Sequence, residues 1–213
     1  MRRPALAIGF LSALVLSGCL LPHAPAEVTE PQLRVASSDS SDSSESSASS
    51  KPSFTPSQTL LVFINFSSPY SRQFIAEQLP RLIEDFVTPG TLRLEIIPFA
   101  IKKYPLSTQQ AINFACASAQ GKAFAIAPLL ATQPLPLKQP QLTTLDIDVA
   151  AFTQCLKSPE GTSWIEANAK RAADHAVTVV PTFILNTETS VGLSEYADLR
   201  GWIEQMLDSP FQS

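Results

Sequence analysis

The sequence is poor in the residues that several classes of functional site require. It contains three cysteines, Cys19, Cys116 and Cys155, and no two of them form a Cys-x-x-Cys motif. Two histidines, His23 and His175, add too few ligands for a metal site. Lysine and arginine do not cluster, and the net charge is −4. We therefore predict that the protein holds no metal and does not bind nucleic acid.

The apolar run at the N-terminus, Ala5 to Leu16, is too short to span a bilayer comfortably. It follows the positive segment Met1-Arg2-Arg3, which together with the run is typical of an export signal. Leu16-Ser17-Gly18-Cys19 resembles the lipobox of bacterial lipoproteins. The resemblance implies a signal peptide over 1–18 and acylation of Cys19, with palmitate among the lipids, so that the mature protein is anchored to a membrane of the cell envelope. An ordinary signal with a chance cysteine is the alternative.

Residues 19–57 lack the apolar periodicity of a folded segment. They contain several prolines and the run SSDSSDSSESSASS at 37–50. Such a composition buries too little apolar surface to offset the entropy lost on ordering. We therefore predict a disordered tether over 19–57 and a folded domain over 58–213.

The folded part starts with the pattern of a βαβ unit. Leu60–Phe66 is a continuous apolar run, as in a strand buried on both faces. Apolar residues then recur at helical spacing from Phe74 to Phe86, with Pro80 predicting a kink or break. Leu92–Ile97 is the second predicted strand, and a right-handed crossover makes it parallel to the first.

A helical insertion is predicted over about 105–175, before a C-terminal ββα unit. Within it, the stretch 133–141 is proline-rich and is predicted to be neither helix nor central strand. Four helices are predicted at 108–119, 121–130, 147–156 and 162–173. β-Branched and aromatic residues around Pro181 then indicate a strand, a second strand follows near 190–192, and Ser194 is the predicted cap of a final helix.

This order, with the stretches LLVFINFSSPYSRQF, LPRLIEDFVTPGTLRLEIIPF and VTVVPTFIL, resembles the DsbA-like disulfide oxidoreductases. The resemblance covers roughly residues 58–208. It implies an α/β thioredoxin fold (β-α-β, helical insertion, β-β-α) in which Pro181 is the cis-proline of the loop facing the active corner.

The corner departs from the family at its reactive atoms. The family has Cys-Pro-X-Cys there, whereas this chain has Ser68-Pro69-Tyr70-Ser71. Thiol–disulfide exchange needs a thiolate as attacking and leaving group, and serine cannot form a disulfide. We therefore expect no dithiol chemistry at this corner. The sequence favours a protein that is not an enzyme over one that is.

Several hypotheses remain open for the corner. Ser67 or Ser68 could serve only as a helix cap, with Pro69 in the first turn and Tyr70 as surface area. Alternatively, the corner and the backbone beside Val180 and Pro181 could bind an extended peptide through main-chain hydrogen bonds.

Catalytic hypotheses also remain. Ser-Pro-Tyr-Ser resembles the corner of kappa-class glutathione transferases, which implies a transferase or isomerase in which Ser68 donates a hydrogen bond to the glutathione thiolate. A thiol–disulfide oxidoreductase follows if the serines replace native cysteines. Hydrolysis by Ser68 would need His175 as a base, but the sequence has neither a glycine-flanked elbow nor an assigned acid partner.

Cys116 and Cys155 form an even pair in an exported chain, which favours a disulfide between them. Some DsbA-like proteins carry a second, non-catalytic bridge in this region, and the resemblance implies the same role here. If the two cysteines were instead redox-active, they would make the chain an oxidoreductase.

The sequence thus predicts a lipid-anchored envelope protein whose folded domain lies outside the cytoplasm. Its predicted function is that of a folding helper or adaptor, which binds an extended peptide or an envelope protein at Ser68, Pro69, Tyr70, Ser71, Val180 and Pro181 and needs no cofactor.

Overall fold

The computed structural model describes residues 58–209. The predicted signal peptide, the lipidation of Cys19, the tether and His23 lie outside the described residues. Between 58 and 209, no helix is both long and apolar enough to cross a bilayer.

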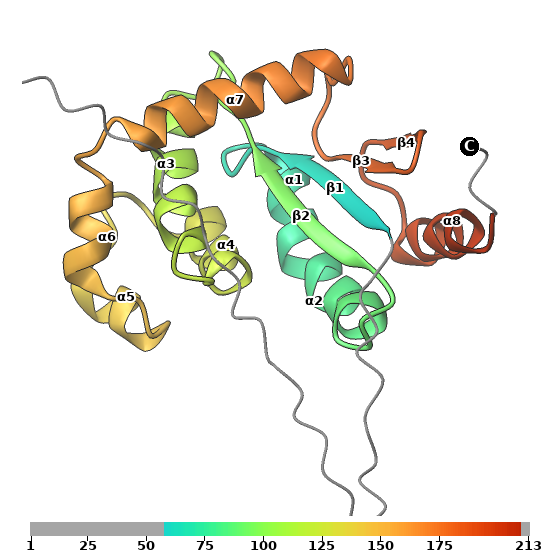
Figure 1. Cartoon of the computed structure of the whole chain (residues 1–213), viewed down its shortest axis with the longest axis horizontal. Helices are drawn as coiled ribbons and strands as arrows, with labels where there is room; N and C mark the ends of the chain where they lie inside the picture. The colour runs from blue at the N-terminus through green and yellow to red at the C-terminus, as the bar shows by residue number, and fades with distance from the viewer. Residues whose placement is uncertain (1–57, 210–213) are drawn as a thin grey trace, which may run out of the picture. The chain divides into compact units, whose positions relative to one another are not determined.

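A four-stranded mixed sheet forms the centre of the domain (Figure 1). Its strands are β1 (Thr59–Ile64), β2 (Arg93–Pro98), β3 (Thr182–Leu185) and β4 (Glu188–Val191), in the spatial order β2-β1-β3-β4. β1 pairs in parallel with β2 and antiparallel with β3, and β3 pairs antiparallel with β4. The parallel pair is joined by a helix, as a βαβ crossover requires. The predicted α/β thioredoxin fold is confirmed.

The crossover helix between β1 and β2 is not a uniform α-helix. It runs as α1 (Pro69–Gln73), the π-helical turn η1 (Phe74–Gln78), α2 (Leu79–Leu82) and the π-helical turn η2 (Ile83–Val87). In η1 the N–H of Leu79 donates to the C=O of Phe74, five residues back. Pro80 has no N–H and clashes with a regular α-helical turn, so a widened turn before it relieves the conflict. The irregularity predicted at Pro80 is confirmed.

The insertion between β2 and β3 consists of five helices in place of the four predicted. They are α3 (Ser107–Ser118), α4 (Ala123–Thr132), α5 (Gln139–Thr144), α6 (Val149–Cys155) and α7 (Glu160–Asp174). The prediction that 133–141 contains no helix is wrong at its end, because α5 begins at Gln139. Pro140 occupies its first turn, where the missing N–H costs nothing.

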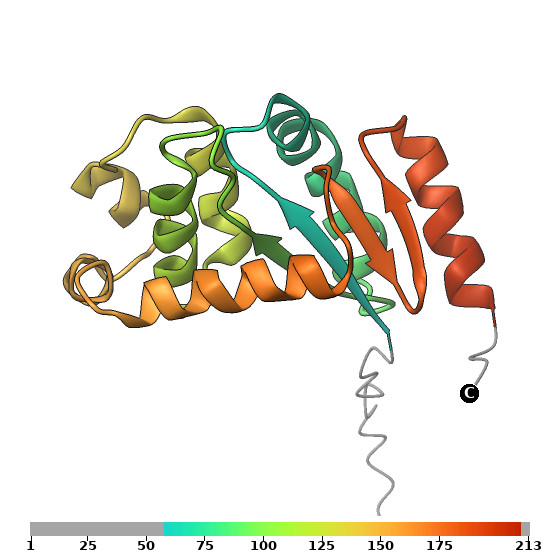
Figure 2. The same ribbon diagram turned by 90° about the horizontal axis from the view of Figure 1, so that it is seen from above.

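Helices cover both faces of the sheet (Figure 2). Leu60, Val62 and Ile64 of β1 join the larger core cluster, which also contains residues of the crossover helix and of α8 (Tyr196–Asp208). Phe63 belongs to a smaller cluster with Ile97, Ile184 and Ala172 of α7. Alternate residues of β1 therefore face opposite helical layers, which explains why this strand is a continuous apolar run.

The prediction that Ser194 caps the last helix is wrong. The residue preceding α8 is Glu195, and no side chain makes a capping hydrogen bond there. The C=O of Ser194 instead accepts a hydrogen bond from Gln78 Nε2 at 2.6 Å. This contact joins the segment before α8 to the crossover helix.

Candidate functional site

The corner between β1 and α1 is a tight turn with few free backbone groups. The Ser68 N–H donates to the Asn65 C=O at 2.9 Å, and the Ser68 C=O accepts from the Arg72 N–H at 2.9 Å. Ser68 has extended backbone angles (φ −76°, ψ 129°) and precedes Pro69 at the first helical position. The sequence therefore placed the turn and the start of the helix correctly.

The three serines of the corner have different environments. Ser68 occupies the capping position, but its side chain makes no capping hydrogen bond, so the predicted cap is wrong in its chemistry. Ser71 is fully buried, and its Oγ accepts a hydrogen bond from the Asn65 N–H at 3.2 Å. Ser67 Oγ donates to Gln110 Oε1 at 2.6 Å. Ser71 and Ser67 thus hold the turn in place, whereas Ser68 has no side-chain partner among the described residues.

Asn65 and Gln110 organise the corner, and the sequence reasoning missed both. Buried Asn65 accepts the Ser67 N–H at its Oδ1 and donates from Nδ2 to the Phe99 C=O at 2.9 Å. Buried Gln110 donates from Nε2 to the Leu130 C=O at 3.0 Å. The available signals were Asn65 inside the apolar run LLVFINF and Gln110 at the start of an alanine-rich helix. Both are amides in stretches predicted to be buried, and buried amides need hydrogen-bond partners.

The loop that contains Pro181 lies at the same end of the sheet as the corner. The Val180–Pro181 peptide bond is cis, as the resemblance implied. Phe63 pairs with Thr182, so the end of β1 and the start of β3 lie side by side. The rings of Phe74 and Phe183 pack edge to face with centroids 5.1 Å apart.

The backbone of this loop is only partly used. Thr182 Oγ1 donates to the Val179 C=O at 2.7 Å, and the Gly192 N–H donates to the Pro181 C=O at 2.8 Å. Within residues 58–209, neither the N–H nor the C=O of Val180 has a hydrogen-bond partner. Val180, which is only 7% exposed as a whole residue, thus has a main-chain donor and acceptor without a partner in the described part of the chain.

The exposed surface at this end of the sheet comes from the Tyr70 ring and the Val179 side chain rather than from Ser68. Tyr70 is 62% exposed and Val179 is 47% exposed, whereas Ser68 is only 3% exposed. A partner would therefore first contact apolar and aromatic surface, and would reach the Ser68 hydroxyl only at close approach.

His175 is not placed as a base for Ser68. Its ring packs on Phe63, with centroids 5.8 Å apart. Phe63 belongs to the cluster on the α7 side of the sheet, and the crossover helix packs on the other side. The hydrolytic hypothesis therefore has no geometric support. In the described part of the chain, no three histidine, cysteine, aspartate or glutamate side chains cluster as metal ligands.

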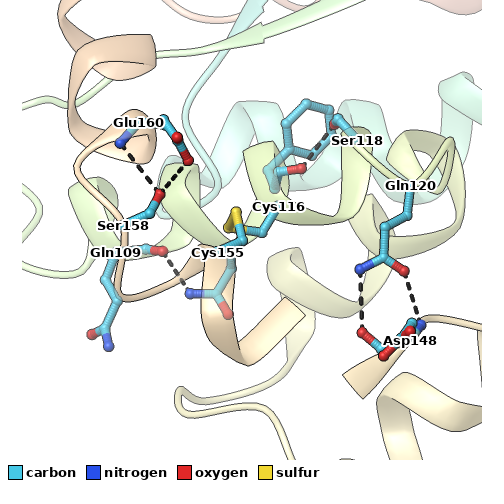
Figure 3. Close-up of a disulfide and its surroundings, with 10 residues drawn as sticks. Gln109, Cys116, Ser118, Gln120, Asp148, Cys155, Ser158 and Glu160 are labelled. Atoms are coloured by element: carbon cyan, nitrogen blue, oxygen red, sulfur yellow. Dashed lines mark hydrogen bonds between the residues drawn. A yellow bond between two sulfur atoms is a disulfide. The ribbon is translucent and has the colours of Figure 1, made fainter. Parts of the chain in front are cut away.

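The predicted disulfide is present in the structure and joins Cys116 of α3 to Cys155 of α6 (Figure 3). Cys116 is 1% exposed, and Cys155 is the last residue of its helix. A helix C-terminus disfavours a thiolate, and burial does so as well. These surroundings are those of a structural bridge rather than of a reactive pair.

Sequence comparison decides the family. A thioredoxin family model matches residues 55–205. The chain belongs to the thioredoxin family. The match spans the corner, the helical insertion and the proline loop. None of the curated proteins is similar enough in sequence to count as a relative of this thioredoxin-family chain.

Solved structures agree on the DsbA-like variant of the thioredoxin fold. A thioredoxin-like oxidoreductase from Silicibacter pomeroyi DSS-3 is 19% identical, with a TM-score of 0.60 over 73% of this chain and 89% of that one. DsbA from Chlamydia trachomatis is 16% identical, with a TM-score of 0.60 over 71% and 87%. A periplasmic thioredoxin-like protein from Salmonella enterica serovar Typhimurium is 17% identical, with a TM-score of 0.56 over 72% and 86%.

Proposed function

We propose that the chain is an envelope lipoprotein whose thioredoxin-type domain binds an extended polypeptide and carries out no dithiol exchange. In this role it acts as a folding helper or adaptor that needs no cofactor. The observation that carries the proposal is the backbone of Val180, whose N–H and C=O have no partner in the described part of the chain.

An unpaired donor and acceptor on one residue match the main chain of an extended peptide. An added strand gains affinity from main-chain hydrogen bonds and specificity from neighbouring side-chain contacts. Tyr70 and Val179 supply exposed apolar surface at this end of the sheet. A polypeptide bound at Val180 would therefore cover surface that water otherwise contacts.

The absence of thiols excludes electron transfer at the corner. Ser68 and Ser71 occupy the positions of the family's cysteine pair, and a hydroxyl can neither form nor break a disulfide. Ser71 is in addition engaged by the Asn65 N–H. Binding can persist in such a site, because the Val180 backbone and the Tyr70 ring do not depend on sulfur.

The proposed location rests on the N-terminal sequence. A signal peptide over 1–18 and acylation of Cys19 would place the folded domain outside the cytoplasm, at a membrane surface. The similarity in fold to the periplasmic thioredoxin-like protein from Salmonella enterica supports this compartment.

Binding can be measured with a permanently unfolded probe, reduced and carboxymethylated α-lactalbumin carrying a fluorescent label. We expect saturable binding to the full chain by fluorescence anisotropy. Val179→Ser should weaken it roughly three- to tenfold through lost apolar contact. Leu156→Ser is the control, since Leu156 is 37% exposed at the end of α6 in the helical insertion, away from the proline loop, and its loss should leave the affinity unchanged.

Two results would contradict the proposal. One is the absence of binding by the unmodified chain. The other is an equal effect of Val179→Ser and Leu156→Ser, which would mean that the probe does not use the proline loop.

A second function, glutathione-dependent transfer or isomerisation, is favoured by one observation. The Ser68 hydroxyl has no side-chain partner among residues 58–209 and lies at a helix N-terminus, where a thiolate would be stabilised. Millimolar glutathione should then raise the melting temperature, and Ser68→Ala should abolish the rise. No rise in the unmodified chain would contradict this second function.

A further inference from the structure

A cavity of about 280 Å³ lies in the helical insertion, between α3, α5 and α6. Its most buried lining residues are Asn113, Leu142 and Phe152, each at most 3% exposed. Leu137 and Val149 add partly buried apolar surface. None of the lining residues carries a charge. Ligand sites are typically concave, mostly apolar and equipped with a few placed polar groups, and this cavity has that composition.

Asn113 supplies the placed polar group. Its Nδ2 donates to the Gln109 C=O at 2.8 Å, which fixes the orientation of the amide. Its Oδ1 has no donor within residues 58–209, and it is not among the fully enclosed oxygens that lack one. Asn113 lines the cavity, so its Oδ1 is the acceptor that we assign to a ligand there. An acceptor in a mostly apolar site orients a ligand through a hydrogen bond from the ligand's N–H or O–H.

Two walls of the cavity, α3 and α6, are fastened to each other. The Cys116–Cys155 disulfide fastens α6 to α3 (Figure 3). Beside it, Gln120 Nε2 donates to the Asp148 C=O at 3.2 Å, and the Asp148 N–H donates to Gln120 Oε1 at 2.8 Å. Walls that are held together in this way reduce the affinity that a ligand loses to ordering them.

We propose that this cavity binds a small, uncharged, mainly apolar molecule that carries one hydrogen-bond donor. The apolar walls select against charge, since a charged ligand would lose its hydration without gaining a partner. The Asn113 Oδ1 accepts the ligand's donor. The site is separate from the corner, so the proposal stands or falls independently of peptide binding there.

Indole and 1-benzothiophene are suitable probes, because they share a bicyclic shape and only indole has an N–H. Calorimetric titration of the full chain should give saturable binding of indole with one site. Asn113→Leu should lower the affinity for indole relative to that for benzothiophene by about three- to tenfold. The comparison of ratios removes the difference in hydrophobicity between the two probes.

A blocking variant tests the location without disturbing the core. Thr153 is exposed at the cavity, and its hydroxyl donates only to the Val149 C=O of its own helix. Thr153→Trp should weaken indole binding at least tenfold. Thr132→Trp is the control, since Thr132 is also exposed, makes the same kind of bond within α4 and does not line the cavity.

Three results would overturn the proposal. They are no saturable binding of indole by the unmodified chain, equal binding by the two tryptophan variants, and a ratio of affinities that Asn113→Leu leaves unchanged.

Discussion

Loss of the disulfide should lower stability by an amount that the chain topology sets. Cys116 and Cys155 are 39 residues apart in sequence, so the bridge closes a loop of 40 residues. The loop-entropy relation gives about 13 cal/mol/K, or about 4 kcal/mol at 25 °C. For a folded domain of this size, each kcal/mol shifts the melting temperature by roughly 2–4 °C. The double variant Cys116→Ala, Cys155→Ala should therefore melt about 8–16 °C lower than the unmodified protein.

Circular dichroism at increasing temperature, with and without a phosphine reductant, measures this effect. The reductant should lower the melting temperature of the unmodified protein by a similar amount and leave the double variant unaffected. The comparison separates the constraint of the bridge from the packing lost on substitution to alanine, because the reduced protein keeps both sulfur atoms. The entropic argument would be refuted if the melting temperatures of the reduced protein and of the double variant were both less than about 3 °C below that of the oxidised, unmodified protein.

Two further predictions concern the folded domain. Burial and the hydrogen bond to Asp85 raise the pKa of Tyr196 above its ordinary value of 10. The unfolded chain therefore loses this proton first, so stability holds below pH 10 and falls above it by up to about 1.4 kcal/mol per pH unit. In urea unfolding at several pH values, Tyr196→Phe should reduce this fall in stability, and an equal fall in the variant and the unmodified chain would contradict the assignment. Asn65→Ala should cost about 2–4 kcal/mol, since it removes the partners of the Ser67 N–H and the Phe99 C=O, and a loss under 1 kcal/mol would contradict that role.

The sequence predicted the elements whose signals are local. β1 follows from its continuous apolar run, and the irregular helix follows from the missing N–H of Pro80. The position of cis-Pro181 follows from the resemblance to the DsbA-like proteins. The start of α5 inside a proline-rich stretch was missed, because proline forbids the interior of a helix and not its first turn.

The site was less predictable, because its hydrogen bonds join residues far apart in sequence. Ser67 and Gln110 are 43 residues apart, and Asn65 and Phe99 are 34 apart. A capping preference assigns Ser68 a local role, but only the folded structure shows that its side chain makes no such bond. Likewise, the sequence placed His175 near the proline loop, and the packing of its ring on Phe63 came from tertiary structure.

Insulin reduction tests the central claim most directly. The claim is that the corner has the backbone arrangement of the family but carries hydroxyls at Ser68 and Ser71 in place of the thiols that exchange disulfides. With dithiothreitol as reductant, the full chain should not accelerate insulin precipitation beyond the uncatalysed rate. The double variant Ser68→Cys, Ser71→Cys should accelerate it, because a helix N-terminus favours the thiolate. Rapid turnover by the unmodified chain would contradict the account and would identify Cys116 and Cys155 as the reactive pair.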